Sequence, residues 1–406
     1  MTEHTPADTA EPGPAPVVAS PGGGTDPVPP DWNPRGPRVR RDARAAYDEA
    51  RSRCPVAHGP DGTWTLFSHA DVTRAALDHE TFSNAVSAHL QVPNGLDGPT
   101  HTAFRAVVDT FFTPERMAAL EPVVGRVASA AVAALDVPGR LDAVALGARF
   151  AVRAQSAWLG WPPDLEGTLL AWMADHRAAN RSRDRARTAA VAERFTAIVR
   201  ELAAARRSPG APDDVTAELV RSRVDGRPLT DAEVVSVLRN WTGGDLGSMA
   251  LAAGVVVARL ADDRELQDRL RAGVGDGELD AVLDEILRID DPFVGNRRVT
   301  TRPVTVRGRD LPAGARVVLN WTAANRDPHA FGDPDAFDPE GHAADNLVWG
   351  IGKHVCPGRP LATLELRALV RALLAATTTI TPDPDRPRER ELPPAGGYAT
   401  VPVVIG

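Results

Sequence analysis

One cysteine lies in a loop that glycines and a proline make unusually tight. The loop reads WGIGKHVCPG over residues 349–358, and PLATLELRALVRALL follows it with helical periodicity. A cysteine just before a helix has its thiolate stabilised by the helix dipole and by free backbone N–H groups. Such a thiolate acts as a nucleophile or as a metal ligand. The alternative, a buried structural cysteine in a glycine-rich turn, leaves the spacing of Gly350, Gly352 and His354 unexplained.

The composition excludes several classes of protein. The 406 residues are 43% hydrophobic and 25% charged, which is ordinary for a globular protein and not for a disordered or fibrous chain. The net charge of −8 argues against general nucleic-acid binding and does not favour anionic membranes. Cys54 and Cys356 are too few for a disulfide framework, a four-cysteine zinc site or an iron–sulfur cluster.

The domain organisation is simple. Residues 1–37 are rich in Pro, Gly and Ala and predict a disordered tail, because they carry too little apolar surface to fold. Residues 38–406 predict a single large domain that is mainly α with minor β. The tail lacks the apolar run and basic start of a signal peptide, and no run of 18 or more apolar residues predicts a membrane span. We therefore expect a soluble, cytoplasmic protein.

Local patterns place the main elements. We expect a strand at 63–67, a helix at 69–79 opened by Ser68 or Asp71, and a long loop at 82–98. From 102 to about 260 the chain is mostly helical, and its last helix begins at Asp231 with Thr230 and Glu233 as a capping box. The remaining expected elements are helices at 43–53, 278–290 and 359–376, strands at 297–301, 304–308 and 315–321, and a terminal hairpin at 391–406.

The cysteine loop resembles that of the cytochrome P450 family. The family's loop has the form Phe-Gly-x-Gly-x-His-x-Cys-x-Gly, and this chain departs from it only at Trp349, which replaces the phenylalanine before Gly350. The resemblance implies a P450-like fold with haem b, whose iron is ligated by Cys356. Thiolate ligation favours cleavage of the O–O bond. Trp349 is expected to pack beside the sulfur.

A second motif supports the resemblance and departs from it at one position. Glu285 and Arg288 match the family's Glu-x-x-Arg, and their spacing places both side chains on one helix face as a buried pair. The family completes this pair with an arginine from a Phe-x-Pro-x-Arg segment. Here that segment ends in Gly341, so we expect His342 or a backbone carbonyl to take the place of the arginine.

Four further residues match positions that bind haem propionates in the family. His101 and Arg105 are four residues apart and so point at one anion. Arg298 opens a strand after the Glu-x-x-Arg helix, and His354 precedes the cysteine by two residues. Each alone could be an ordinary surface charge, but the four together indicate a cofactor site.

The long helix matches the family's oxygen-activating helix by position. Aligned on the acid, Asp245 keeps the carboxylate, and Leu246 replaces the alcohol that normally follows it. The acid and alcohol deliver protons to bound dioxygen, a form of general acid catalysis. Ser248, one turn further on, is a candidate replacement for the alcohol. It is equally consistent with simple helix packing.

The resemblance also implies a set of residues around the substrate. For each of them, packing in the core is as good an explanation as contact with a substrate, and Trp241 is of interest because an indole can stack on an aromatic partner. The set comprises Leu90 from the 85–94 loop, Leu238, Trp241, Thr242 and Leu246 from the long helix, Phe293 and Val294 after the Glu-x-x-Arg helix, and Tyr398.

These features predict a monomeric haem-thiolate monooxygenase that oxidises a small organic or peptide substrate in bacterial secondary metabolism. Its electrons would come from a ferredoxin and a ferredoxin reductase, with Arg359 near the docking face. Oxidative coupling of an aromatic peptide or amino-acid derivative is one variant of this chemistry. A peroxide-driven peroxygenase and a non-catalytic haem-thiolate ligand-binding protein are the alternatives.

Overall fold

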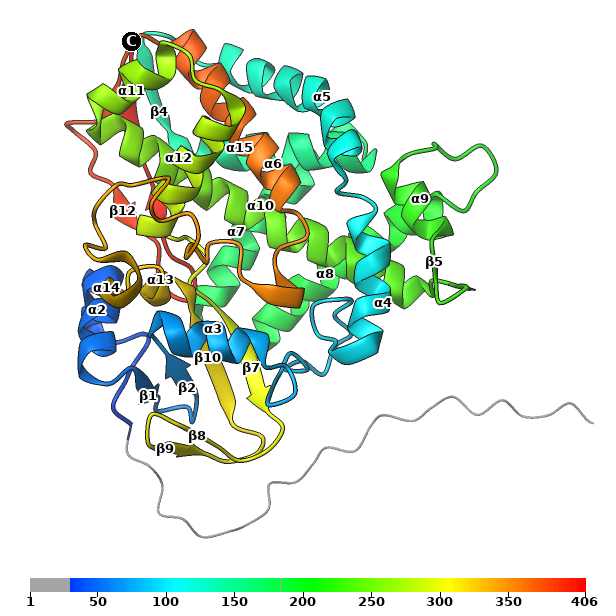
Figure 1. Cartoon of the computed structure of the whole chain (residues 1–406). Coiled ribbons are helices and arrows are strands. Elements are labelled where there is room, and N and C mark those ends of the chain that lie inside the picture. The colour runs from blue at the N-terminus through cyan, green and yellow to red at the C-terminus, as the bar shows by residue number, and fades with distance from the viewer. Residues whose placement is uncertain (1–29, 183) are drawn as a thin grey trace, which may run out of the picture.

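The computed structural model describes residues 30–182 and 184–406. Helices form most of it, and the larger sheet lies at the lower left of Figure 1. The α-helices are α1 (Pro37–Arg41), α2 (Ala43–Arg53), α3 (His69–Leu77), α4 (Gly98–Asp109), α5 (Pro114–Ala133), α6 (Ala143–Leu159), α7 (Glu166–Ser182), α8 (Arg185–Ala205), α9 (Val215–Arg221), α10 (Asp231–Asp262), α11 (Arg264–Arg271), α12 (Asp276–Ile289), α13 (Trp321–Ala324), α14 (Pro328–Phe331) and α15 (Arg359–Ala376).

The strands are short and form one five-stranded sheet and several smaller ones. In the larger sheet the order is β1-β2-β10-β7-β3, with β2 and β10 parallel and the other neighbours antiparallel. The strands are β1 (Val56–His58), β2 (Trp64–Leu66), β3 (Phe82–Ser83), β4 (Gly139–Asp142), β5 (Arg223–Val224), β6 (Arg227–Pro228), β7 (Gly295–Thr300), β8 (Val304–Val306), β9 (Arg309–Leu311), β10 (Arg316–Asn320), β11 (Ile380–Pro382), β12 (Glu389–Arg390), β13 (Tyr398–Thr400) and β14 (Pro402–Ile405). The prediction of a mainly α domain with minor β is confirmed.

Helix α10 runs through the middle of the helical part (Figure 1) and packs against α6, α8, α12 and α15. It begins as predicted, because Thr230 and Glu233 form a complete capping box. Of the described helices, α10 alone is long and apolar enough to cross a membrane. Most of that stretch is buried against other helices, so its apolar character is that of a core helix.

Most expected boundaries are confirmed. Ser68, and not Asp71, caps α3, since its side chain accepts a hydrogen bond from the Asp71 N–H. The prediction of a terminal hairpin at 391–406 is wrong. Strand β13 pairs with β12, whereas β14 lies between β11 and the distant β4. The pairing with β4 buries Val403 and Ile405, which a two-stranded hairpin would leave half open.

The packed structure begins before residue 38, where we expected it to start. Trp32 packs edge-on against Phe67, with 5.0 Å between ring centroids, and also contacts Tyr47. The Asp31 carboxylate accepts a hydrogen bond from the His58 N–H. Residues 30–37 therefore belong to the domain, because one tryptophan supplies the apolar contact that their composition otherwise lacks. The rest of the predicted tail, residues 1–29, lies outside the described residues.

Candidate active site

The cysteine loop has the tight geometry that its glycines predict. Gly350 and Gly352 both have φ of +72°, a conformation that other residues rarely adopt. The Cys356 N–H donates to the Trp349 carbonyl at 2.8 Å and so closes the loop. Helix α15 then starts at Arg359. The backbone N–H groups of Gly358 and Arg359 favour the thiolate, but burial outweighs them and raises the pKa of Cys356. A bound cation would offset this cost.

Trp349 anchors the loop to the neighbouring helix α12. Its Nε1 donates to Asp284 Oδ1 at 2.7 Å, and Arg359 donates to Asp284 Oδ2 at 2.8 Å. Burial raises the pKa of Asp284, although both donors oppose the shift. One carboxylate therefore joins the first turn of α15 to the residue that replaces the family's phenylalanine.

A cluster of basic side chains lies beside the loop. The rings of His101 and His354 are 4.1 Å apart between centroids. Burial, then His101 and Arg298, lowers the pKa of His354 to about 3, and burial lowers the pKa of Arg298 to about 10. His101 Nδ1 and Arg298 Nε are buried without a hydrogen-bond partner. Basic groups gathered in this way, with donors unused, form a site for an anion.

One acidic residue faces this cluster. Asp97 lies 3.5 Å from His354 Nε2, and Asn84 links the two by binding both Asp97 Oδ1 and His354 Nε2. Burial opposes ionisation of Asp97, but hydrogen bonds from Ser83 and Asn84 hold its pKa below the ordinary value. Sequence reasoning missed Asn84 and Asp97, because neither belongs to a recognised spacing.

Arg105 holds the loop in place. Its guanidinium donates to the carbonyls of Lys353 and Val355 at 3.0 and 2.7 Å, and its Nε donates to Asp109 at 2.5 Å. His101 and Arg105 both lie beside the loop, and the prediction that they point at one anion stays a prediction. In this structure Arg105 makes its polar contacts with Asp109 and the backbone.

Glu285 and Arg288 form the expected pair, with N···O distances of 2.7 and 2.8 Å and almost no exposure. Arg288 also donates to three carbonyls, including that of Asn325 at 2.7 Å. His342 Nδ1 lies 2.7 Å from Glu285 Oε1, so this histidine occupies the side of the pair where the family has an arginine. Of the two expected replacements, His342 reaches the Glu285 carboxylate, whereas the backbone carbonyls accept from Arg288 and do not replace a donor.

The middle of α10 has an open face. Gly243, Gly244 and Gly247 are exposed in a helix that is otherwise mostly buried, and Ser248 is half-buried beside them. A Cβ added at Gly244 or Gly247 would have no atom within 4 Å, so there is free space next to both. This open face of a central helix (Figure 1) is a candidate site for a bound group.

Asp245 is half-buried next to Gly244. Burial of its carboxyl raises its pKa to about 7, and the Gln155 amide opposes the shift. Asp245 Oδ2 has no hydrogen-bond partner, and the same holds for both carboxyl oxygens of Glu365 on α15. Burial, then Asp245, raises the pKa of Glu365 well above its ordinary value. Glu365 gave no sequence signal, because a single glutamate in a helix is ordinarily a surface residue.

Known proteins resemble this chain over most of its length. The family model "Cytochrome P450" matches residues 178–400. The erythromycin C-12 hydroxylase of Saccharopolyspora erythraea is 32% identical over 84% of this chain and 88% of that protein. The chain belongs to the cytochrome P450 family. The cyclomarin C epoxidase CymV of Salinispora arenicola is 31% identical over 76% of this chain and 82% of that protein. A mutant of P450 EryK in complex with erythromycin B superposes with a TM-score of 0.81 at 29% identity, over 90% of this chain and 96% of that one.

P450 proteins are oxidoreductases that bind haem through a cysteine thiolate. The residues of this P450 fit such a group. In the basic cluster, His101 and Arg298 have unpartnered nitrogens for the propionates, and the glycines of α10 leave open space beside the helix. Cys356 is a half-buried thiol whose pKa is raised by burial, so its ionisation is favoured by a compensating charge.

Some expected pocket residues of this P450 lie elsewhere. Leu238, Thr242 and Leu246 have no exposed surface, so they pack in the core instead of facing the open space. The reason is helical phase: they follow one another at four-residue steps on a different face from Gly244 and Gly247. Trp241 is also buried and packs against Phe111, Phe112 and Trp158.

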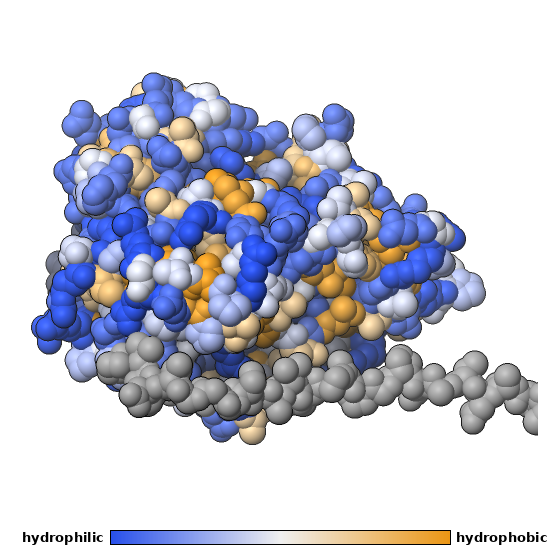
Figure 2. All heavy atoms as spheres, turned by 60° about the horizontal axis from the view of Figure 1, so that its bottom comes forward, coloured by the Kyte–Doolittle hydropathy of each residue, from blue (hydrophilic) through white to orange (hydrophobic). Residues whose placement is uncertain are grey.

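The other expected pocket residues keep accessible surface. Leu90 is 46% exposed and Phe293 is 45% exposed, while Val294 and Tyr398 are half-buried. The Leu90 carbonyl accepts a hydrogen bond from Ser236, which fastens the 85–94 loop to α10. Figure 2 shows hydrophobic residues gathered between hydrophilic ones on one face of the molecule. These four residues therefore keep accessible surface, and their place around a substrate stays a prediction.

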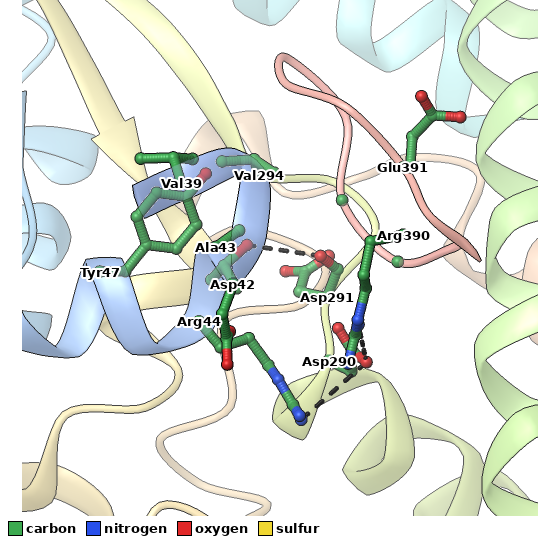
Figure 3. A pocket seen from close by; sticks show the side chains of 13 residues that line it. Val39, Asp42, Ala43, Arg44, Tyr47, Asp290, Asp291, Val294, Arg390 and Glu391 are labelled. Atoms are coloured by element: carbon green, nitrogen blue, oxygen red, sulfur yellow. Dashed lines mark hydrogen bonds and ion pairs between the residues drawn. The ribbon is translucent and has the colours of Figure 1, made fainter. Parts of the chain in front are cut away.

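A separate polar pocket lies behind the turn that follows α12. In Figure 3, Arg44 and Arg390 both reach Asp290, and Asp291 lies at the back of the pocket. Its accessible volume of about 20 Å³ suits a water molecule and not a substrate. This pocket ties α2 to the 390–397 segment and is not the reaction site.

Proposed function

We propose that Cys356 ligates haem iron and that this P450 is a monooxygenase of bacterial secondary metabolism. The observation that carries the proposal is the position of the Cys356 loop beside His354 and two buried basic side chains, His101 and Arg298, that each have a nitrogen without a partner. The names of two relatives, an epoxidase and a hydroxylase, support insertion of an oxygen atom. A loaded haem supplies dioxygen activation, and the protein supplies binding, orientation and protons.

Asp245 and Ser248 are the candidates for handling protons. A carboxyl with a pKa of about 7 both holds and releases a proton at neutral pH, which is the property a general acid needs. Ser248 is half-buried beside the open face of α10 and can carry a proton toward it, directly or through water. In this proposal Asp245 supplies the proton from the interior, and Ser248 takes the role of the missing alcohol at Leu246.

The substrate is a bulky apolar secondary metabolite in this proposal. Gly243, Gly244 and Gly247 leave room along α10, and Leu90 and Phe293 offer exposed apolar surface. Oxidative coupling loses one argument, because Trp241 packs among core rings and does not face the open space. We therefore place oxygen insertion ahead of coupling.

A ferredoxin and its reductase are the proposed electron source for a monomeric, cytoplasmic protein. Arg359 is half-exposed next to the cysteine loop and is already paired with Asp284. Lys353, in the same loop, is exposed. These two positive charges suit an acidic electron-transfer protein.

The first test is a carbon monoxide difference spectrum of the dithionite-reduced protein. Thiolate ligation by Cys356 predicts a red-shifted Soret band that is lost in Cys356→Ala and kept in Cys54→Ala, a matched control at the other cysteine. A wild-type spectrum of the histidine-ligated type would overturn the assignment.

A second experiment separates the alternative chemistries. Turnover under ¹⁸O₂ with reduced ferredoxin should place one labelled oxygen atom in the product. A product without new oxygen would support coupling, and equal turnover with peroxide alone would support a peroxygenase. Ligand binding without any turnover would support a non-catalytic carrier.

A further inference from the structure

Four aromatic rings form a continuous cluster between the cysteine loop and the surface. Phe111 and Phe112 follow α4, Trp158 ends α6 and Trp241 lies in α10. Phe112, Trp158 and Trp241 form a closed triangle, with centroids 5.1 to 5.6 Å apart, and Phe111 adds a contact of 5.0 Å to Trp241. Rings at such distances are in van der Waals contact, so an electron can pass directly from one indole to the other.

The inner end of the cluster touches the cysteine loop. A Cβ added at Gly358 would lie 3.8 Å from Phe112 Cε1 and 3.9 Å from Cys356 Sγ. Both atoms therefore lie within van der Waals distance of the same Cβ position, which places the Phe112 ring close to the Cys356 sulfur.

The outer end opens to solvent. Trp158 lines a surface pocket of about 590 Å³ together with Gly160 and Val215. The pocket is large enough for a small aromatic molecule. Trp158 itself is 6% exposed, so it presents only an edge of its ring there.

Trp241 differs from Trp161 and Trp172 in its polar contacts, and it shares an unpartnered indole N–H with the half-buried Trp32. Trp161 Nε1 donates to Thr216 at 3.0 Å and Trp172 Nε1 donates to the Val191 carbonyl at 3.2 Å, whereas Trp241 Nε1 is buried without an acceptor. Buried indole N–H groups usually find a partner, so this position keeps an indole at a cost. An indole without an acceptor retains its proton when it loses an electron, and it can therefore take the electron back without moving a proton.

We propose that Trp241 and Trp158 conduct electrons from the surface pocket to the centre held at Cys356, and that this path gives the protein a peroxidase activity toward small phenols. The proposal rests on haem ligation by Cys356. In each cycle hydrogen peroxide accepts two electrons and two protons and becomes two molecules of water. Two phenol molecules at the pocket each give up one electron and one proton and leave as phenoxyl radicals. The tryptophans return to their starting state.

The test compares phenol oxidation in variants that keep the packing. Haem-loaded protein is mixed with hydrogen peroxide and guaiacol, and the oxidised guaiacol is followed by absorbance. We expect Trp158→Phe and Trp241→Phe to lower the rate at least about tenfold, because phenylalanine is much harder to oxidise. Trp64→Phe, at a buried tryptophan in β2, is the matched control and should leave the rate unchanged.

A second readout does not depend on turnover. When peroxide is added without phenol, electron paramagnetic resonance should show a tryptophanyl radical that Trp241→Phe removes. Peptide mapping should then find oxidised Trp158 and Trp241 but unmodified Trp64. Equal guaiacol rates in wild type and both cluster variants would overturn the path, since phenol would then reach the haem directly. Loss of the carbon monoxide band in the wild type would instead overturn the ligation proposal.

Discussion

His342 Nδ1 lies 2.7 Å from Glu285 Oε1, in a site where the glutamate side chain is 1% exposed. The same oxygen accepts the Asp338 N–H at 3.1 Å, so the carboxylate is fully engaged. Gly341 stands at the expected arginine position, and any side chain there would force Asp338 to move. A Cβ there would lie 2.2 Å from Asp338 Oδ2, and the Gly341 N–H already donates to Asp338 Oδ1.

His342→Ala should destabilise the fold by about 1–3 kcal/mol, because it leaves a buried carboxylate oxygen short of a donor. His342→Asn places an amide N–H near the position of Nδ1 and should recover part of the loss. Urea unfolding of the three proteins measures the difference. Equal stability of wild type and alanine variant would show that backbone donors suffice.

Restoring the family's arginine at position 341 should not stabilise the fold. Gly341→Arg and Gly341→Ala both force Asp338 to move and give up its hydrogen bond, so each should lose about 1 kcal/mol in unfolding experiments. Gly277→Ala is the control, since a Cβ there meets no atom within 4 Å. A stabilised Gly341→Arg protein would contradict the replacement by His342.

The basic cluster predicts a specific role for Arg298 in haem retention. Arg298 is buried and Arg297, next to it on β7, faces outward. Arg298→Ala should lower the haem content of the purified protein and speed haem transfer to apomyoglobin, because a propionate loses its donor. Arg297→Ala removes the same charge from the other face of the strand and should behave as wild type. Equal haem loss from both variants would assign the effect to net charge.

The residues that sequence reasoning identified are those held by short motifs. Cys356, Glu285 and Arg288 stand at fixed spacings within one loop or helix, and the loop and the paired side chains have the predicted geometry. We expected His342 to contact Glu285 because Gly341 stands where the family's Phe-x-Pro-x-Arg segment has its arginine. Residues close together in the chain determine the geometry of such motifs, so the sequence alone predicts it.

Features that depend on distant segments could not be predicted. The pairing of β14 with β4 joins residues far apart in the chain, and nothing in either strand marks its partner. The break between α7 and α8 lacks glycine and proline, although Asp184 caps α8 by accepting the Arg187 N–H. The raised pKa of Asp245 depends on which helices pack around α10 and not on its neighbours in sequence.

Asp245 should make stability fall with rising pH. Its pKa is raised from 3.8 to about 7 in the folded protein, so between these values the folded state holds a proton that the unfolded chain has released. Asp245→Asn removes this pH-dependent loss. Its free energy of unfolding should exceed that of the wild type by up to roughly 4 kcal/mol at about pH 8 and by little at about pH 4. Unfolding midpoints at both pH values measure the effect.

Glu201→Gln makes the matching change at an exposed glutamate of α8 and should shift neither midpoint. The charge of Asp245 raises the pKa of Glu365, so Asp245→Asn should also lower the pKa of Glu365 and part of its gain should arise there. The gain from Asp245→Asn should then be smaller in the Glu365→Gln background. Fully additive gains would show that the two acids do not interact.

The free space beside Gly247 predicts that stability and ligand binding respond in opposite directions. Gly247→Leu meets no atom within 4 Å at its Cβ and replaces a mid-helix glycine, so it should stabilise the fold by up to about 1 kcal/mol. The leucine would occupy the open space beside α10 and should weaken imidazole binding to the ferric haem, read from the Soret shift. Gly125→Leu in α5 also has a free Cβ position and should stabilise without weakening imidazole binding. Unchanged imidazole affinity in Gly247→Leu would show that this face of α10 does not line the haem cavity.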